Sequence, residues 1–73
     1  MSEKIIWKRP DDSVVSCTEK IKVLNENLEE LRQVAQDAFE DALLMECDEA
    51  QIRDVFRELI EGLVNPYEPP DLT

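Results

Sequence analysis

Residues 17–45, CTEKIKVLNENLEELRQVAQDAFEDALLM, place an apolar or small residue at alternating steps of four and three. This is the spacing of the two inward positions of a heptad repeat, and only a helix brings such positions onto one face. We call these residues the heptad seam: Cys17, Ile21, Leu24, Leu28, Leu31, Ala35, Ala38, Ala42 and Met45. The pattern predicts one long helix to which the rest of the chain is attached.

The expected start of this helix comes from Ser16 and Glu19, which have the S-x-x-E spacing of a capping box. In such a box the serine hydroxyl accepts a hydrogen bond from an otherwise unpaired backbone N–H, and the glutamate reaches back to the cap. No glycine or proline follows before Gly62. We therefore expect the first helix over about 16–46.

A second helix is expected directly afterwards. Asp48 and Gln51 form another capping box, and Cys47 and Ile52 occupy the two positions of a hydrophobic staple. A proline at Pro66 stops the pattern. The apolar positions in between form a wide stripe, at Ile52, Val55, Phe56, Leu59, Ile60, Leu63 and Val64. These signals predict a helix over about 48–64.

A short turn between two helices makes them antiparallel neighbours, so the predicted fold is an all-α two-helix hairpin. In the register that pairs Ala42 with Ile52, three alanines of the first helix face large residues of the second, which lets the two axes approach closely. The further pairs are Ala38 with Phe56, Ala35 with Leu59, and Leu31 with Leu63. The predicted hairpin core consists of the residues of these pairs other than Leu31: Ala35, Ala38, Ala42, Ile52, Phe56, Leu59 and Leu63.

The hairpin leaves apolar surface uncovered, because the second helix is about half as long as the first. The predicted interaction or dimer seam is Cys17, Ile21, Leu24, Leu28 and Leu31. A two-helix hairpin has no interior of its own, so this surface needs a cover. A second copy is the simplest cover and would give a homodimeric four-helix bundle. The sequence leaves parallel and antiparallel pairing open.

Both ends of the chain are expected to be extended arms of a single domain that spans 1–73. Residues 1–15 form the first arm, with a turn at 11–13, and 65–73 form a proline-rich tail. Candidate arm contacts are Ile5, Ile6, Trp7 and Tyr67. Tyr67 and Leu72 are candidates to lie over Leu24 and Leu28.

The charge is −10 and unevenly placed: residues 1–22 have a net charge of +1 and residues 23–73 of −11. Such a surface repels phosphate backbones and anionic lipid, so we expect no nucleic-acid partner and no membrane partner. It suits a basic protein partner. No segment has the apolar length of a membrane span and the N-terminus does not resemble a signal peptide, so a cytoplasmic location is expected.

The residues that catalysis and metal binding use are mostly missing from the sequence. The chain has no histidine, which excludes Ser/His/Asp and Cys/His arrangements, and it has no phosphate-binding glycine loop. Asp37, Glu40 and Asp41 share one side of the first helix, but a Glu-rich helix produces such groups by chance. Cys17 and Cys47, about 45 Å apart along the first helix, cannot bond within one chain and are expected to be buried. We expect no enzymatic activity, no cofactor and no metal site.

The function that these patterns favour is that of a small acidic, non-enzymatic protein–protein interaction or regulatory module. The alternative is a nucleic-acid-mimicking inhibitor or antitoxin-like protein that binds a basic partner. That alternative needs regular rows of acids, which Glu26, Glu30, Asp37 and Asp41 approach on one face of the first helix. High salt would abolish binding of the mimic type and leave apolar binding largely intact.

Overall fold

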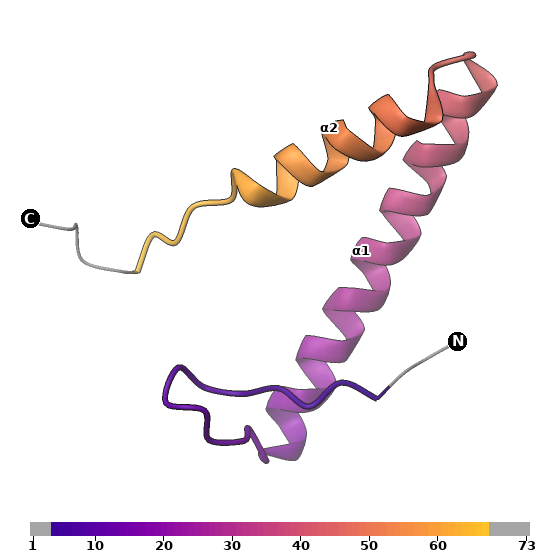
Figure 1. The fold of residues 1–73 in the computed structure, drawn as a ribbon. Coiled ribbons are helices and arrows are strands. Elements are labelled where there is room, and N and C mark those ends of the chain that lie inside the picture. The colour runs from indigo at the N-terminus through magenta and orange to yellow at the C-terminus, as the bar shows by residue number, and fades with distance from the viewer. Residues whose placement is uncertain (1–3, 68–73) are drawn as a thin grey trace, which may run out of the picture. The chain divides into compact units, whose positions relative to one another are not determined.

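The computed structural model describes residues 4–67, whose regular structure consists of two α-helices (Figure 1). Helix α1 is Thr18–Leu44 and helix α2 is Glu49–Glu61. No strand occurs within residues 4–67, so the prediction of an all-α helical hairpin is confirmed at this level. The predicted ranges, 16–46 and 48–64, extend beyond the observed helices at both ends. Among the described residues, neither helix combines the length and hydrophobicity that crossing a membrane requires.

The chain divides into two compact units, Met1–Asp37 and Ala38–Thr73, and α1 continues through the boundary between them. The first unit holds the segment that precedes α1 and most of α1 itself. The second unit holds the last turns of α1, the connecting turn and α2. Each unit has its own set of contacts.

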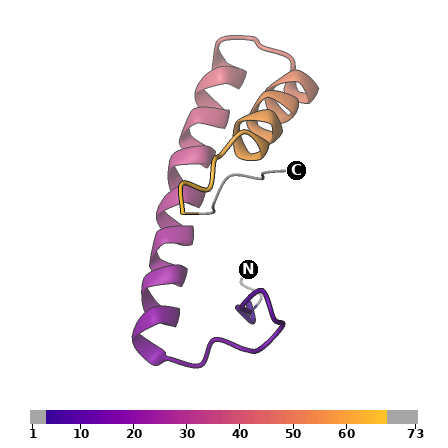
Figure 2. The ribbon, with the colours of Figure 1, turned by 90° about the vertical axis from the view of Figure 1, so that its left-hand side faces the viewer.

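In the first unit, residues 4–17 fold back as a loop at the start of α1 (Figure 2). Lys8 and Val14 form an isolated antiparallel bridge. Beside it, the backbone N–H of Val15 donates to the carbonyl of Trp7 at 2.8 Å. The described part of the predicted extended arm is therefore a closed loop, because these backbone groups pair with one another.

A tight turn closes this loop, at the place where the sequence predicts one. The backbone N–H of Asp12 donates to the carbonyl of Arg9 at 2.8 Å, and Asp12 has a positive φ of 74°. Aspartate tolerates this left-handed conformation better than most residues. The Asp11 carboxylate accepts hydrogen bonds from the hydroxyl and the backbone N–H of Ser13, which lowers the pKa of Asp11.

Helix α1 begins one residue later than the predicted cap implies. The carbonyl of Cys17 accepts the first helical hydrogen bond, from the backbone N–H of Ile21 at 3.0 Å. Cys17, and not Ser16, therefore occupies the N-cap position. The backbone N–H groups of Lys20 and Glu19 donate to the Cys17 sulfur and lower the pKa of this thiol. The prediction of a Ser16 cap was wrong because the sulfur takes the place expected for a hydroxyl.

Helix α1 ends at Leu44 because the chain enters a left-handed turn. Glu46 has a positive φ of 69°, and the backbone N–H of Cys47 donates to the carbonyl of Ala42 at 3.0 Å. The N–H of Glu46 donates to Leu43, also at 3.0 Å. These two bonds make a Schellman motif, which usually places glycine where Glu46 stands. The sequence carries no glycine signal here, so the predicted end at 46 was too late.

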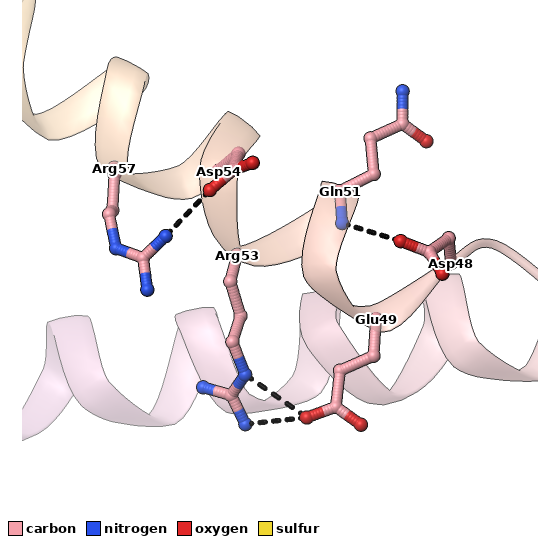
Figure 3. Close-up of polar contacts among 6 residues, drawn as sticks. All are labelled: Asp48, Glu49, Gln51, Arg53, Asp54 and Arg57. Atoms are coloured by element: carbon pink, nitrogen blue, oxygen red, sulfur yellow. Dashed lines mark hydrogen bonds and ion pairs between the residues drawn. The ribbon is translucent and has the colours of Figure 1, made fainter.

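Helix α2 begins where the capping box predicts. The Asp48 carboxylate accepts a hydrogen bond from the backbone N–H of Gln51 at 2.9 Å (Figure 3). Along the helix, Arg53 lies 3.1 Å from Glu49, and Arg57 lies 2.6 Å from Asp54. The helix ends at Glu61, before Gly62, a residue with low helix propensity.

Candidate interaction surface

The second unit has a small apolar core where α2 meets the last turns of α1. Ile52 is 5% exposed, and it is the one residue among 4–67 that is buried. The rings of Phe39 and Phe56 meet edge to face, with their centroids 6.4 Å apart. The guanidinium of Arg53 lies 4.7 Å from the centre of the Phe39 ring, within cation–π range. Half-buried Ala42 lies on the same part of α1.

The predicted hairpin core is found here only in part. Ile52 is buried and Ala42 and Phe56 are half-buried, whereas Ala38 is exposed. Sequence reasoning placed Phe39 beside the predicted contact and not in the hairpin core, yet the Phe39 ring supplies the aromatic contact to Phe56. A pairing of the chain's two phenylalanines was a signal that could have been used.

Two of the predicted pairs, Ala35 with Leu59 and Leu31 with Leu63, join residues of different units and stay predictions. Ala35 is half-buried, while Leu59 and Leu63 are 65% and 70% exposed.

In the first unit, the loop of residues 4–17 bonds to α1 next to the predicted dimer seam. The indole N–H of Trp7 donates to the side-chain oxygen of Asn25 at 2.9 Å. On a helix, Asn25 lies on the same face as Ile21, Leu24 and Leu28, and these three side chains are half-buried. Of the candidate arm contacts, Trp7 is therefore placed on α1. Sequence reasoning named Trp7 but missed its polar partner Asn25.

The other candidate arm residues are exposed. Ile5 and Ile6 lie on the loop with much of their surface in solvent, and Tyr67 is 92% exposed. The predicted contact of Tyr67 with Leu24 and Leu28 joins different units and stays a prediction. Leu72 lies outside the described residues.

Large apolar side chains remain exposed on both helices. On α1, Leu31 and Val34 are 51% and 67% exposed. Apart from Ile52 and Phe56, the large apolar side chains of α2 and of the residues just after it are also exposed. We call this second group the α2 strip: Val55, Leu59, Ile60, Leu63 and Val64.

Both cysteines are free and exposed, so the expectation that they would be buried was wrong. Cys17 is at the N-cap of α1, where its sulfur accepts backbone hydrogen bonds. Cys47 lies in the turn between the helices, as expected.

The acidic side chains are solvated, and several have partners. Lys22 Nζ lies 3.6 Å from Glu26, and the Gln33 amide donates to Asp37 at 3.1 Å. Two of the four acids in the predicted acidic row are therefore engaged within α1. Within residues 4–67, no three Cys, Asp or Glu side chains are grouped closely enough to hold a metal ion.

Comparison with known proteins found no family model, curated protein or solved structure that matches the chain. The candidate interaction surface therefore consists of the exposed apolar residues of α1 and the α2 strip.

Proposed function

We propose that this chain is a small, acidic, non-enzymatic module that acts by binding protein through apolar surface, and that it does so as a homodimeric four-helix bundle. One observation carries the proposal. The apolar patterns of α1 and α2 continue over exposed residues such as Leu31, Leu59 and Leu63, while Ile52 is the one described residue that is buried.

The energetics of folding support a partner. Fully burying one leucine-sized side chain contributes roughly 1.5–3 kcal/mol, whereas ordering one residue costs about 1–2 kcal/mol in backbone entropy. Small chains bury the least of their surface and often need a second copy or another staple. Covering Leu31, Leu59 and Leu63 would supply apolar burial that these units do not make by themselves.

The acidic surface fits a regulatory role as well as solubility. Solvated acids on the outer faces would select a basic protein as a further partner. The two free thiols, Cys17 and Cys47, suit a reducing compartment, so the cytoplasm is the proposed location.

The nucleic-acid mimic remains the second candidate because residues 23–73 have a net charge of −11. The Lys22–Glu26 pair and the Gln33–Asp37 hydrogen bond weaken it, since a mimic needs its acids free for the basic partner.

Salt dependence and one charged substitution separate the two candidates. We would measure the association of the chain with itself, and with proteins that co-purify from its native cells, at low salt and in about 1 M NaCl, where the screening length is about 3 Å. The variants are Leu59→Glu, within the α2 strip, and Gln51→Glu, which adds the same charge in the first turn of α2.

Association that persists in high salt, is lost in Leu59→Glu and is kept in Gln51→Glu is the result expected for apolar binding. Association that disappears in high salt and is insensitive to Leu59→Glu would favour the mimic. A chain that stays monomeric and unaccompanied at every salt concentration would contradict both.

A further inference from the structure

The seam residues change in size along α1. The first half carries large residues, Ile21, Leu24, Leu28 and Leu31, and the second half carries Ala35, Ala38 and Ala42. If two copies of α1 paired in parallel, each seam residue would meet its own equivalent. Three alanine layers would then leave space at one end of the pair, because the four large layers at the other end hold the helix axes further apart. An antiparallel pair places large residues against small ones instead.

We propose that, in the homodimer of the proposed function on which this inference rests, the two α1 helices pair antiparallel about a two-fold axis midway between positions 29 and 30. In this register Leu28 faces Leu31 of the second copy, and Leu24 faces Ala35. Continuing outward, Ile21 faces Ala38, and Cys17 faces Ala42. Every layer pairs the two different inward positions of the heptad, as antiparallel packing of seam residues requires, and three of the four pair a larger residue with alanine.

The same register brings one lysine and one aspartate together at each end of the contact. Lys20, Asn27, Val34 and Asp41 flank the seam on one side at seven-residue intervals. With the axis between positions 29 and 30, Asp41 is the residue of this flank on the second copy that lies nearest to Lys20, offset by two residues or about 3 Å along the helix axis, and Val34 lies in the same way nearest to Asn27. Two-fold symmetry repeats the Lys20–Asp41 pair, so each dimer has two of them.

Lys20 and Asp41 have no ion-pair partner among residues 4–67 of their own chain. The other basic residues of the two helices each lie within 4 Å of an acid three or four positions away. These pairs are Lys22 with Glu26, Arg32 with Glu29, Arg53 with Glu49, and Arg57 with Asp54. Lys20 and Asp41 are thus available to each other across a dimer.

The acidity of the chain does not oppose this contact. Six of the seven acids of α1 lie at heptad positions away from the seam, and Asp41 is the exception. A second copy therefore brings no acid against another acid at the flanks of the seam. A basic partner would find its complement on the outer faces and not at this contact, so a copy of the chain is the occupant that the charges favour.

Exposure agrees with the proposed contact. In each unit, the described contact of the chain with α1 falls on the flank opposite to Lys20 and Asp41: Trp7 bonds to Asn25 in the first unit, and Phe56 meets Phe39 in the second. Val34, on the flank of Lys20 and Asp41, is exposed, and so are Leu31 and Ala38 of the seam.

Charge exchange between two variants tests the register. Lys20→Asp places two aspartate pairs in its homodimer, and Asp41→Lys places two lysine pairs in its own. We expect each variant to dissociate about tenfold more readily than wild type, from the loss of two exposed ion pairs and their replacement by repulsion. An equimolar mixture restores both opposite-charge pairs, so the heterodimer should recover wild-type stability. Sedimentation equilibrium of each variant and native mass spectrometry of the mixture give the populations.

Glu30→Lys is the matched control, because it makes the same charge change as Asp41→Lys at a position outside the seam. It should leave dimerisation nearly unchanged and should gain nothing when mixed with Lys20→Asp. Recovery in the mixture cannot come from misfolding of either variant, since both are present in the rescued species.

A dimer that is as stable as wild type in both variants, or a mixture with no preference for the heterodimer, would overturn the antiparallel register. If that dimer were still split by Leu31→Glu, the proposed function would stand without the register. A wild-type chain that is monomeric at every concentration would overturn the inference together with the homodimer, while salt-resistant binding of another protein would still support the proposed function.

Discussion

Two segments of the chain lie against α1, and they cover it to different degrees. The loop formed by residues 4–17 contributes one indole, and the Trp7–Asn25 hydrogen bond holds that indole on the first unit. Helix α2 contributes a periodic stripe, and in the second unit Ile52 is buried while Phe56 meets Phe39. In the first unit, by contrast, no described residue is buried.

The difference follows from periodicity. A helix presents apolar side chains at every third or fourth position, so several of them reach the same surface together. A tight loop presents one or two large side chains and uses its backbone bonds to hold its own shape. We therefore expect stability to depend on α2 more than on the loop. Residues of the heptad seam such as Leu31 and Ala38 stay exposed beside both segments.

Ile52→Ala should have the largest effect, because it removes the one buried side chain and leaves a cavity. We expect it to cost about 2–4 kcal/mol of the free energy of unfolding. Ile60→Ala is the matched control, since Ile60 is 49% exposed, and it should cost less than half as much. Urea unfolding at a fixed protein concentration measures both values, because the proposed dimerisation would make stability depend on concentration. Equal costs would mean that the described core of the second unit does not stabilise the fold.

The two helix starts give the next comparison. Asp48→Ala removes the carboxylate that accepts the Gln51 N–H bond and should cost about 1 kcal/mol. Ser16→Ala should change stability by only a few tenths of a kcal/mol, because Cys17 occupies the N-cap of α1. The same urea titration measures both. A larger loss of stability in Ser16→Ala than in Asp48→Ala would show that Ser16 caps α1, as the sequence pattern predicts.

Trp7→Phe tests the attachment of the loop. The variant keeps an aromatic ring and loses the indole donor to Asn25, so we expect a cost of about 0.5 kcal/mol, at the low end for a hydrogen bond because this one is exposed. A double-mutant cycle with Asn25→Ala isolates the interaction. Strict additivity of the two substitutions would show that the hydrogen bond does not hold the loop in solution.

Substitutions in the two turns should have smaller effects, and these should stabilise the chain where the substitutions above destabilise it. Glu46 and Asp12 both have positive φ values, 69° and 74°, and glycine adopts this region without steric cost. Glu46→Gly should stabilise the chain by about 0.5 kcal/mol, since Glu46 occupies the glycine position of the Schellman motif. Asp12→Gly should gain less, because aspartate already tolerates the conformation. Thermal unfolding of the two variants, side by side, decides the order.

Much of this fold is predictable from local patterns. The heptad seam predicts α1, and the box formed by Asp48 and Gln51 predicts the start of α2, because both signals depend on neighbouring residues. The predicted helix ends failed where the chemistry was unusual. Cys17 replaces Ser16 at the N-cap of α1, and Glu46 adopts a positive φ that a glutamate in the sequence does not predict.

The contacts between distant residues were harder to predict. The Trp7–Asn25 bond joins positions 18 residues apart, and no spacing rule connects a loop indole with a helix amide. Sequence reasoning placed Phe39 beside the predicted hairpin core and not in it, because the predicted register has Phe56 facing Ala38. Exposure of Cys17 and Cys47 also followed from how α1 begins and ends, which the heptad pattern does not determine.

The solution mass of wild type and Leu31→Glu tests most directly whether a second copy closes the exposed seam of α1. Leu31 lies beside the proposed two-fold axis, so one substitution brings two buried charges into the centre of the contact. Light scattering over a range of concentrations should give twice 8.5 kDa for wild type and 8.5 kDa for the variant. Wild type at 8.5 kDa throughout, or a variant that remains a dimer, would contradict the account.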